Sequence, residues 1–116
     1  MIFMCDKLKE IRQKLIEFRD LRNWNQFHDP KNLAEAISIE ASELLEIFLW
    51  KSTDASQDPS LVELKHIREE VSDIFIYSIY LCEVLNIDIL DAVENKIQFN
   101  EKKYPIELAK RSNNKW

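Results

Sequence analysis

Two short acidic motifs could bind a cation: Glu40-Ala41-Ser42-Glu43 and Glu70-Val71-Ser72-Asp73, each within an apolar stretch. The two acids of each motif are three residues apart, so an α-helix places them on nearly one side, roughly one turn apart. Carboxylates with no neighbouring Cys or His form an oxygen ligand set, which suits Mg²⁺, or alternatively Mn²⁺, better than zinc. We therefore predict a divalent cation between two facing helices, bound by Glu40, Glu43, Glu70 and Asp73.

Two of these acids fall within the apolar faces of their predicted helices. Glu40 lies about 60° from the centre of a face marked by Ile37, and Glu70 lies about 40° from a face marked by Ile74. A carboxylate on an apolar face loses hydration, and this cost requires a compensating partner. Because both faces carry such an acid, we expect one shared ligand to compensate both.

Lysine and amide side chains form a second polar stripe on a face that should point inward. Lys96, Asn100 and Lys103 follow one another at i, i+4 and i+7 in a predicted helix. Such cations and an amide can bind phosphate oxygens. Alternatively, the lysines extend toward water or pair with Glu40 and Glu70 in a structural salt-bridge network. The spacing alone leaves these alternatives open.

An aromatic segment, Asn23-Trp24-Asn25-Gln26-Phe27-His28-Asp29-Pro30, precedes the first acidic motif. Pro30 restricts the backbone of Asp29, so we expect an irregular, non-helical segment. Its rings could cover the core, or they could stack on a planar base. Aromatic rings, inward lysines and an oxygen-ligated cation together indicate a site for a nucleotide polyphosphate.

Apolar residues at three- and four-residue spacing predict four helices that would position these groups. The expected helices cover about residues 6–22, 32–50, 60–85 and 89–103. We expect a mobile loop over residues 51–58, and Tyr104-Pro105 should end the last helix. The expected N-caps are Asp6; Asn32 with Glu35; either Asp58 before Pro59 or Ser60 with Glu63; and Asp88.

Composition favours an all-α fold in a single domain. The 116 residues include no glycine, where average usage would give about eight, and hairpins depend on glycine turns. The net charge of -5 argues against a protein that binds polymeric nucleic acid. We find no apolar run of the ~20 residues that span a membrane and no secretory signal. Cys5 and Cys82 form no metal or redox motif, so we expect a cytoplasmic protein with reduced thiols.

The predicted third helix is apolar nearly all round, because Leu61, Ile76 and Ile79 lie on the side opposite Ile74. Such a helix must be covered on several sides. Four helices can hardly provide that cover alone, so we expect a homo-oligomer, either a dimer or a tetramer.

The paired acidic motifs resemble those of the all-α nucleoside triphosphate pyrophosphohydrolases, the MazG-like superfamily. Four stretches look like its dCTP pyrophosphatase branch: residues 24–33, Phe48-Leu49-Trp50-Lys51, residues 69–77 and Tyr104-Pro105. The resemblance implies a four-helix bundle completed by oligomerisation, and one nucleotide pyrophosphohydrolase domain over residues 1–116. It further implies Mg²⁺-dependent hydrolysis of dCTP, or a modified dCTP, to the monophosphate and pyrophosphate. Ser42 departs from the family, whose members commonly have glycine there.

The resemblance also implies a role for each matching position. The four motif acids match metal ligands, and Glu43 or Glu40 is expected to orient or deprotonate the attacking water. The expected substrate-binding residues are Trp24, Phe27, His28, Trp50, Tyr77, Lys96, Asn100, Lys103 and Tyr104. We expect Trp24, Phe27 and Trp50 to enclose the base.

Two other functions remain open at this point. A MazG-like enzyme could act on another, non-canonical nucleoside triphosphate or on phosphoribosyl-ATP. Alternatively, the chain could be a non-catalytic helical interaction protein, in which the inward acids and lysines neutralise each other.

Overall fold

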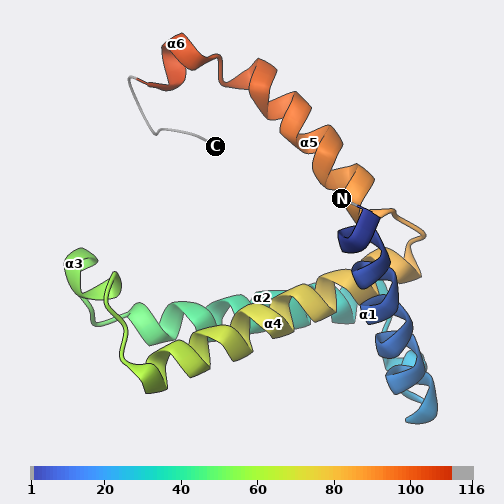
Figure 1. The fold of residues 1–116 in the computed structure, drawn as a ribbon. Coiled ribbons are helices and arrows are strands. Elements are labelled where there is room, and N and C mark those ends of the chain that lie inside the picture. The colour runs from blue at the N-terminus through green and yellow to red at the C-terminus, as the bar shows by residue number, and fades with distance from the viewer. Residues whose placement is uncertain (1, 111–116) are drawn as a thin grey trace. The chain divides into compact units, whose positions relative to one another are not determined.

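The computed structural model describes residues 2–110, with side chains from residue 6 onward, and every regular element in this range is a helix (Figure 1). The predicted all-α fold class is therefore confirmed. The chain forms two compact units, one ending at Leu85 and the other beginning at Asn86. The expectation of a single domain stays a prediction. None of the described helices is long and apolar enough to cross a membrane.

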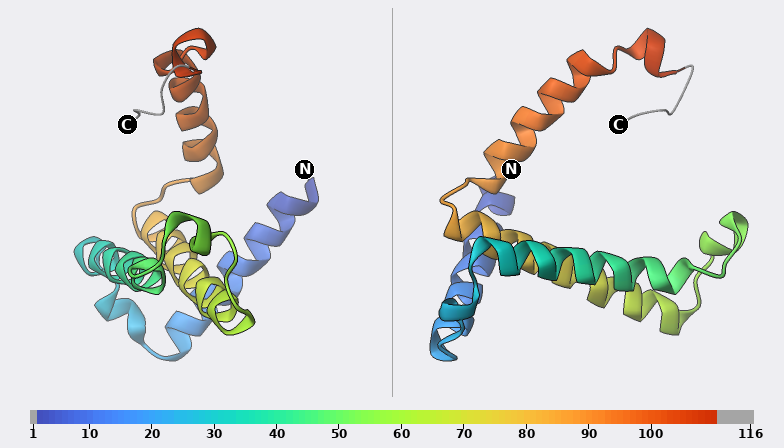
Figure 2. Two further views of the ribbon diagram at one scale, coloured as in Figure 1. Left: turned by 90° about the vertical axis from the view of Figure 1, so that its left-hand side faces the viewer. Right: turned by 180° about the vertical axis from the view of Figure 1, so that it is seen from behind.

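The first unit is built around two long antiparallel helices, α2 (Pro30–Phe48) and α4 (Leu61–Val84), which lie side by side in both figures (Figures 1 and 2). Helix α1 (Ile2–Leu21) contacts α4 near the end of the pair where α2 begins. The 3₁₀ helix η1 (Trp24–Phe27) packs against α1. The short helix α3 (Thr53–Ser56) lies at the opposite end and connects the pair.

The second unit contains α5 (Ile89–Lys103) and the short helix α6 (Ile106–Ala109). The boundaries of α5 agree with the prediction, and the Asp88 carboxylate accepts hydrogen bonds from the backbone of Leu90 and Asp91. Asn86 takes a left-handed conformation, with φ of 57°, just after α4. The tail beyond residue 110 lies outside the described residues.

The start of α2 differs from the prediction because Asp29, and not Asn32, is its N-cap. The Asp29 carboxylate accepts a hydrogen bond from the Asn32 backbone at 2.8 Å, and Pro30 occupies the first turn. The residue before a proline favours extended backbone, which an N-cap requires, and proline at the first helical position loses no hydrogen bond. The helix therefore begins two residues earlier than expected.

At α4, the structure selects Ser60 from the two candidate caps. Its hydroxyl accepts from the Glu63 backbone, and the Glu63 carboxylate accepts from the Ser60 backbone, which completes a capping box. The predicted loop 51–58 contains α3, for which Ser52 is the N-cap. The Lys51 ammonium lies 2.6 Å from the Glu63 carboxylate and ties this connection to α4.

One further expectation about the helix ends was wrong. Asp6 is not an N-cap, because α1 already begins at Ile2. The expectation that the side of α4 opposite Ile74 must be covered is confirmed at Ile79, which is buried. Val71, on the apolar face marked by Ile74, is 50% exposed. The side chain of Cys5 lies outside the described ones, and Cys82 is a free thiol.

Polar contacts fasten α1 to α4 at this end of the first unit. Arg19 is only 9% exposed, and its guanidinium donates to the Glu83 carboxylate at 2.7 Å. The Tyr80 hydroxyl donates to the Leu15 carbonyl at 2.6 Å. These contacts stabilise the end of the helix pair that adjoins the aromatic segment. The buried side chains there also contribute: Leu33, Ile79 and Tyr80.

Candidate metal and nucleotide site

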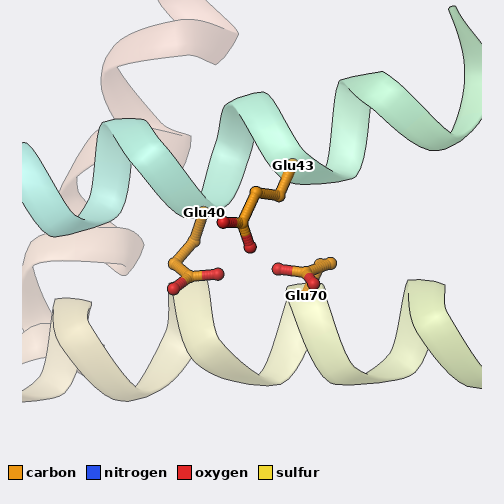
Figure 3. Close-up of side chains that lie close together, drawn as sticks. All are labelled: Glu40, Glu43 and Glu70. Atoms are coloured by element: carbon orange, nitrogen blue, oxygen red, sulfur yellow. The ribbon is translucent and has the colours of Figure 1, made fainter.

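The antiparallel pairing of α2 and α4 brings three of the predicted metal ligands together. Glu40 and Glu43 extend from α2 toward Glu70 on α4 (Figure 3). One carboxylate oxygen of each residue lies within 4.8 Å of the other two. Oxygens on opposite sides of an Mg²⁺ ion are about 4.2 Å apart, so a small contraction of this cluster would suit one ion.

The electrostatics of the cluster favour a bound cation. One oxygen each of Glu40 and Glu70 is buried and accepts no hydrogen bond from the described residues. Hydrogen bonding to Glu70, then burial, then the neighbouring Glu43 raise the pKa of Glu40 to about 7. Two ionised carboxylates can only accept hydrogen bonds, so without a cation they must share a proton or repel each other. A divalent cation removes this conflict and satisfies the buried oxygens.

The fourth predicted ligand, Asp73, lies one turn along α4 from Glu70 and outside the three-residue cluster. Its charge nevertheless contributes to raising the pKa of Glu40. Asp73 is therefore close to the cluster, and its direct ligation stays a prediction. Tyr77, half-buried on the same helix, also lies beside the acids: burial, then the charges of Glu40 and Asp73, raise its pKa.

The aromatic segment forms an ordered turn at one end of the helix pair. Trp24 packs edge-on against Phe18, with ring centroids 5.7 Å apart, and His28 lies 4.7 Å from Tyr80. The Asn32 side chain donates to the Phe27 carbonyl at 3.0 Å. Trp24 and Phe27 remain exposed, so their rings are accessible to a ligand. The prediction of a fully irregular segment was wrong, because residues 24–27 form η1.

His28 differs from the other predicted base contacts because it is half-buried. Its ring lies on Tyr80, and its Nδ1 atom is buried without a hydrogen-bond partner among the described residues. Burial, then the positive charge of Arg19, lower the pKa of His28. The lowered pKa favours the uncharged imidazole, which is held against Tyr80 of α4.

Trp50 lies far from the other predicted base contacts of the same chain. It follows α2, whereas Trp24 and Phe27 precede it, and a helix of 19 residues is about 28 Å long. Its side chain is 93% exposed. One chain therefore does not bring Trp50 to Trp24 and Phe27, and the expected enclosure of a base by all three rings requires more than one chain.

The predicted phosphate contacts Lys96, Asn100 and Lys103 all lie on α5, in the second unit. Lys96 Nζ is 4.6 Å from the centroid of the Phe99 ring, and Lys103 Nζ is 5.4 Å from that of Tyr104. The structure defines the second unit by itself, so contacts of these residues and of Tyr104 with substrate stay predictions.

Sequence reasoning missed two aromatic residues that support the candidate site, Phe18 and Tyr80. Both contact a ring of the aromatic segment from a neighbouring helix. Phe18 could have been found from the sequence, because it lies in the last helical turn before Trp24. For Tyr80, burial by α1 and contact with His28 depend on the tertiary fold, and no local pattern indicates them.

The fold and the acidic cluster define an all-α protein with a candidate divalent-metal site between paired helices. The chain belongs to the MazG-like family, whose sequence pattern matches residues 36–116. This confirms the resemblance predicted from the sequence.

Proteins with curated functions include close relatives. The chain is 39% identical over 112 residues to dCTP pyrophosphatase 1 of Homo sapiens, covering 94% of this chain and 65% of that protein. It is 39% identical over 108 residues to dCTP pyrophosphatase 1 of Rattus norvegicus, covering 90% and 63%. The chain thus spans a little less than two thirds of the length of these relatives.

A solved structure shares the fold. A pyrophosphatase from Archaeoglobus fulgidus superimposes with a TM-score of 0.81 at 44% identity, over 85% of this chain and 93% of that one. The helical arrangement is therefore common to both proteins.

Proposed function

We propose that this protein is a Mg²⁺-dependent nucleoside triphosphate pyrophosphohydrolase that converts dCTP, or a modified dCTP, to the monophosphate and pyrophosphate. The observation that carries this proposal is the cluster of Glu40, Glu43 and Glu70, with its buried, unsatisfied oxygens. Membership of the MazG-like family supports it, as does similarity to proteins named dCTP pyrophosphatase 1. Removal of damaged or unwanted nucleotides from the cytoplasmic pool would be its role.

Glu40, Glu43, Glu70 and Asp73 would hold the metal, for which Mg²⁺ is the first choice and Mn²⁺ the alternative. When bound, such an ion supplies charge neutralisation for the triphosphate and lowers the pKa of water. Glu43 is the most exposed of the three clustered acids, and it is therefore best placed to orient or deprotonate the attacking water. Glu40 is the second candidate for this role.

The remaining predicted residues would bind the nucleotide. Trp24 and Phe27 offer exposed rings for stacking on the base, and His28, whose ring contacts Tyr80 of α4, supports their turn. Tyr77, beside the acids, would hold the nucleotide near the reacting phosphate. Lys96, Asn100, Lys103 and Tyr104 would bind phosphate oxygens, so that positive charge stabilises the departing pyrophosphate.

The proposed active form is a homo-oligomer, a dimer or a tetramer. Large apolar side chains remain exposed on α2, on α4 and at the residue just after α2: Ile39, Leu45, Leu49, Val71 and Phe75. A second copy of the chain would cover exposed apolar side chains of this kind. A second copy would also give Trp50 a role despite its distance from Trp24 and Phe27 of its own chain. It could reach a base held by these two residues of the neighbouring chain.

A nucleotide screen tests the proposed reaction. Purified protein is incubated with each nucleoside triphosphate and Mg²⁺, and pyrophosphate release is measured. We expect dCTP or a modified dCTP to be hydrolysed fastest, and EDTA to abolish release. Absence of hydrolysis with every nucleotide, together with no thermal stabilisation by Mg²⁺ and dCTP, would instead favour the non-catalytic interaction protein.

A further inference from the structure

The ring of Phe18, in the last turn of α1, is contacted by two other side chains. Arg22 lies one turn later, and its Cζ atom is 3.6 Å from the centroid of the Phe18 ring. The Arg22 guanidinium also donates to the Phe18 carbonyl at 3.0 Å. Trp24 meets the Phe18 ring at an interplanar angle of 71°. Phe18 is therefore the side chain that links the end of α1 to the Trp24 indole.

The backbone after α1 directs Trp24 back toward that helix. Asn23 is left-handed, with φ of 54°, and its N–H donates to the Asp20 carbonyl at 3.0 Å. The Gln26 side chain donates to the Asn23 carbonyl at 3.0 Å and closes the turn. These bonds fix the path of the main chain, but none of them fixes the rotamer of the indole.

The Trp24 side chain is 45% exposed, so a ring contact decides how freely it moves. An exposed side chain samples several staggered rotamers unless a neighbour selects one, and selection in advance reduces the entropy lost on binding. Phe18 provides that neighbour, because the two rings meet edge-on while part of the Trp24 side chain stays exposed to solvent. Phe18 is itself 43% exposed, so it contributes little to the buried core of the first unit.

We propose that Phe18 is a positioning residue that selects the Trp24 rotamer able to stack on the substrate base. This inference rests on the proposed function, in which Trp24 binds the base. Phe18 itself does not touch the nucleotide. Replacement by Leu keeps an apolar helix-forming side chain but removes the ring, whereas replacement by Tyr keeps the ring.

The first measurement reads the indole without any nucleotide. In a chain carrying Trp50→Phe and Trp116→Phe, Trp24 is the single tryptophan left of three. We expect Phe18→Leu to lower the fluorescence anisotropy of Trp24, and Phe18→Tyr to leave it unchanged. Leu21→Ala, at an 85% exposed residue of the same helix, is the matched control and should change nothing.

The second measurement uses the full chain with all three tryptophans and dCTP with Mg²⁺. An aromatic pair contributes an amount equivalent to about three- to tenfold in a binding constant, so Phe18→Leu should raise KM by about that factor. The value of kcat should stay within about twofold of the wild-type value, because the carboxylate cluster is untouched. Phe18→Tyr should restore the wild-type KM, and helicity by circular dichroism should be the same for all variants.

The inference is overturned if Phe18→Leu leaves the Trp24 anisotropy unchanged, or changes it without any effect on KM. A fall in kcat at constant KM would also overturn it. A wild-type chain that hydrolyses no nucleotide would contradict the proposed function and the KM effect together. An active wild-type enzyme with an unaffected Phe18→Leu variant would contradict the role of Phe18 alone.

Discussion

At the scale of single residues, the carboxyl group of Glu40 shows the conflict that a cation would resolve. Its pKa rises to about 7, first through Glu70, then through burial and through Glu43. The wheel positions of Glu40 and Glu70 predicted this conflict, because both acids lie on apolar faces. The wheel could not predict that Asp73 lies outside the cluster, since that depends on the distance and rotation between α2 and α4.

Replacement of Glu70 by Gln should abolish hydrolysis and leave the helices intact. The amide retains the size of the side chain but removes one of the charges proposed to hold the metal. We expect kcat/KM for dCTP to fall by at least about 100-fold, with an unchanged far-ultraviolet circular dichroism spectrum. Glu46→Gln, at an exposed acid of α2 outside the cluster, is the control and should retain activity. Full activity of Glu70→Gln would remove Glu70 from the metal site.

Replacement of Glu40 by Gln should have opposite effects on stability with and without metal. In EDTA the change removes a carboxylate from a repulsive cluster, so Tm should rise. In excess Mg²⁺ the variant should lose most of the stabilisation that the metal gives the wild-type protein. Thermal unfolding at pH 8 with each addition measures both effects. Equal metal stabilisation of the two proteins would contradict ligation by Glu40.

At the scale of elements, the pairing of α2 and α4 carries the site, and caps decide where each helix begins. The sequence predicted the four long helices and offered Ser60 with Glu63 as one of two candidate caps for α4, which the structure confirms. It failed at α2, where Asp29 before a proline outcompeted Asn32 as the cap. It also predicted that the side of α4 carrying Ile79 must be covered, but periodicity gives the faces of one helix and not which neighbour covers each face. Packing by α1 supplied that missing information.

The ion pair between Lys51 and Glu63 should make the connection at α3 sensitive to acid. The Lys51 ammonium, then the Ser60 backbone N–H, lower the pKa of Glu63 to about 2. A carboxyl group with a lowered folded-state pKa stabilises the fold above its ordinary value of 4.5, and this stabilisation is lost as the pH falls toward 2. The Tm of Glu63→Gln should therefore lie below the wild-type Tm at pH 6, and the gap should narrow as the pH approaches 2. A gap that does not depend on pH would contradict the ion pair.

Leu33 should be the side chain of α2 whose truncation destabilises the first unit most, because it is only 1% exposed. Leu33→Ala should lower the free energy of unfolding by about 2–5 kcal/mol, measured by urea denaturation. Ala34→Ser, at an exposed neighbouring position, is the control and should change this free energy by less than about 0.5 kcal/mol. A loss below 1 kcal/mol for Leu33→Ala would place the core elsewhere.

At the scale of the whole molecule, the length of α2 separates the rings that were expected to share one base. Trp24 and Phe27 lie before this 19-residue helix and Trp50 lies after it. The sequence identified these residues as candidates. Their separation follows from the unbroken helix α2 between them, which the structure shows. The exposed apolar side chains of α2 and α4 agree with the proposed oligomer, in which one chain supplies Trp50 to a site on another.

A mixing experiment tests whether Trp50 acts between subunits. Trp24→Ala and Trp50→Ala should each raise KM for dCTP, because each removes a ring from every site. When dimers re-form at random from equal amounts of both variants, half of them contain one subunit of each variant. Each of these mixed dimers has one intact site, and its other site lacks both rings. Activity at low dCTP should therefore recover to about a quarter of the wild-type value. Activity no higher than the average of the two variants would contradict a shared site.

The central position of Glu40, Glu43 and Glu70 along the helix pair would separate chemistry from recognition in the proposed enzyme. The acids lie near the middle of α2 and α4, whereas η1 and α3 occupy opposite ends of the same pair. In the proposed enzyme, substitutions in the terminal turns would therefore alter which base is accepted without disturbing the ion. In such a fold, new substrate preferences can evolve at either end of the helix pair while the acids of the proposed metal site stay unchanged.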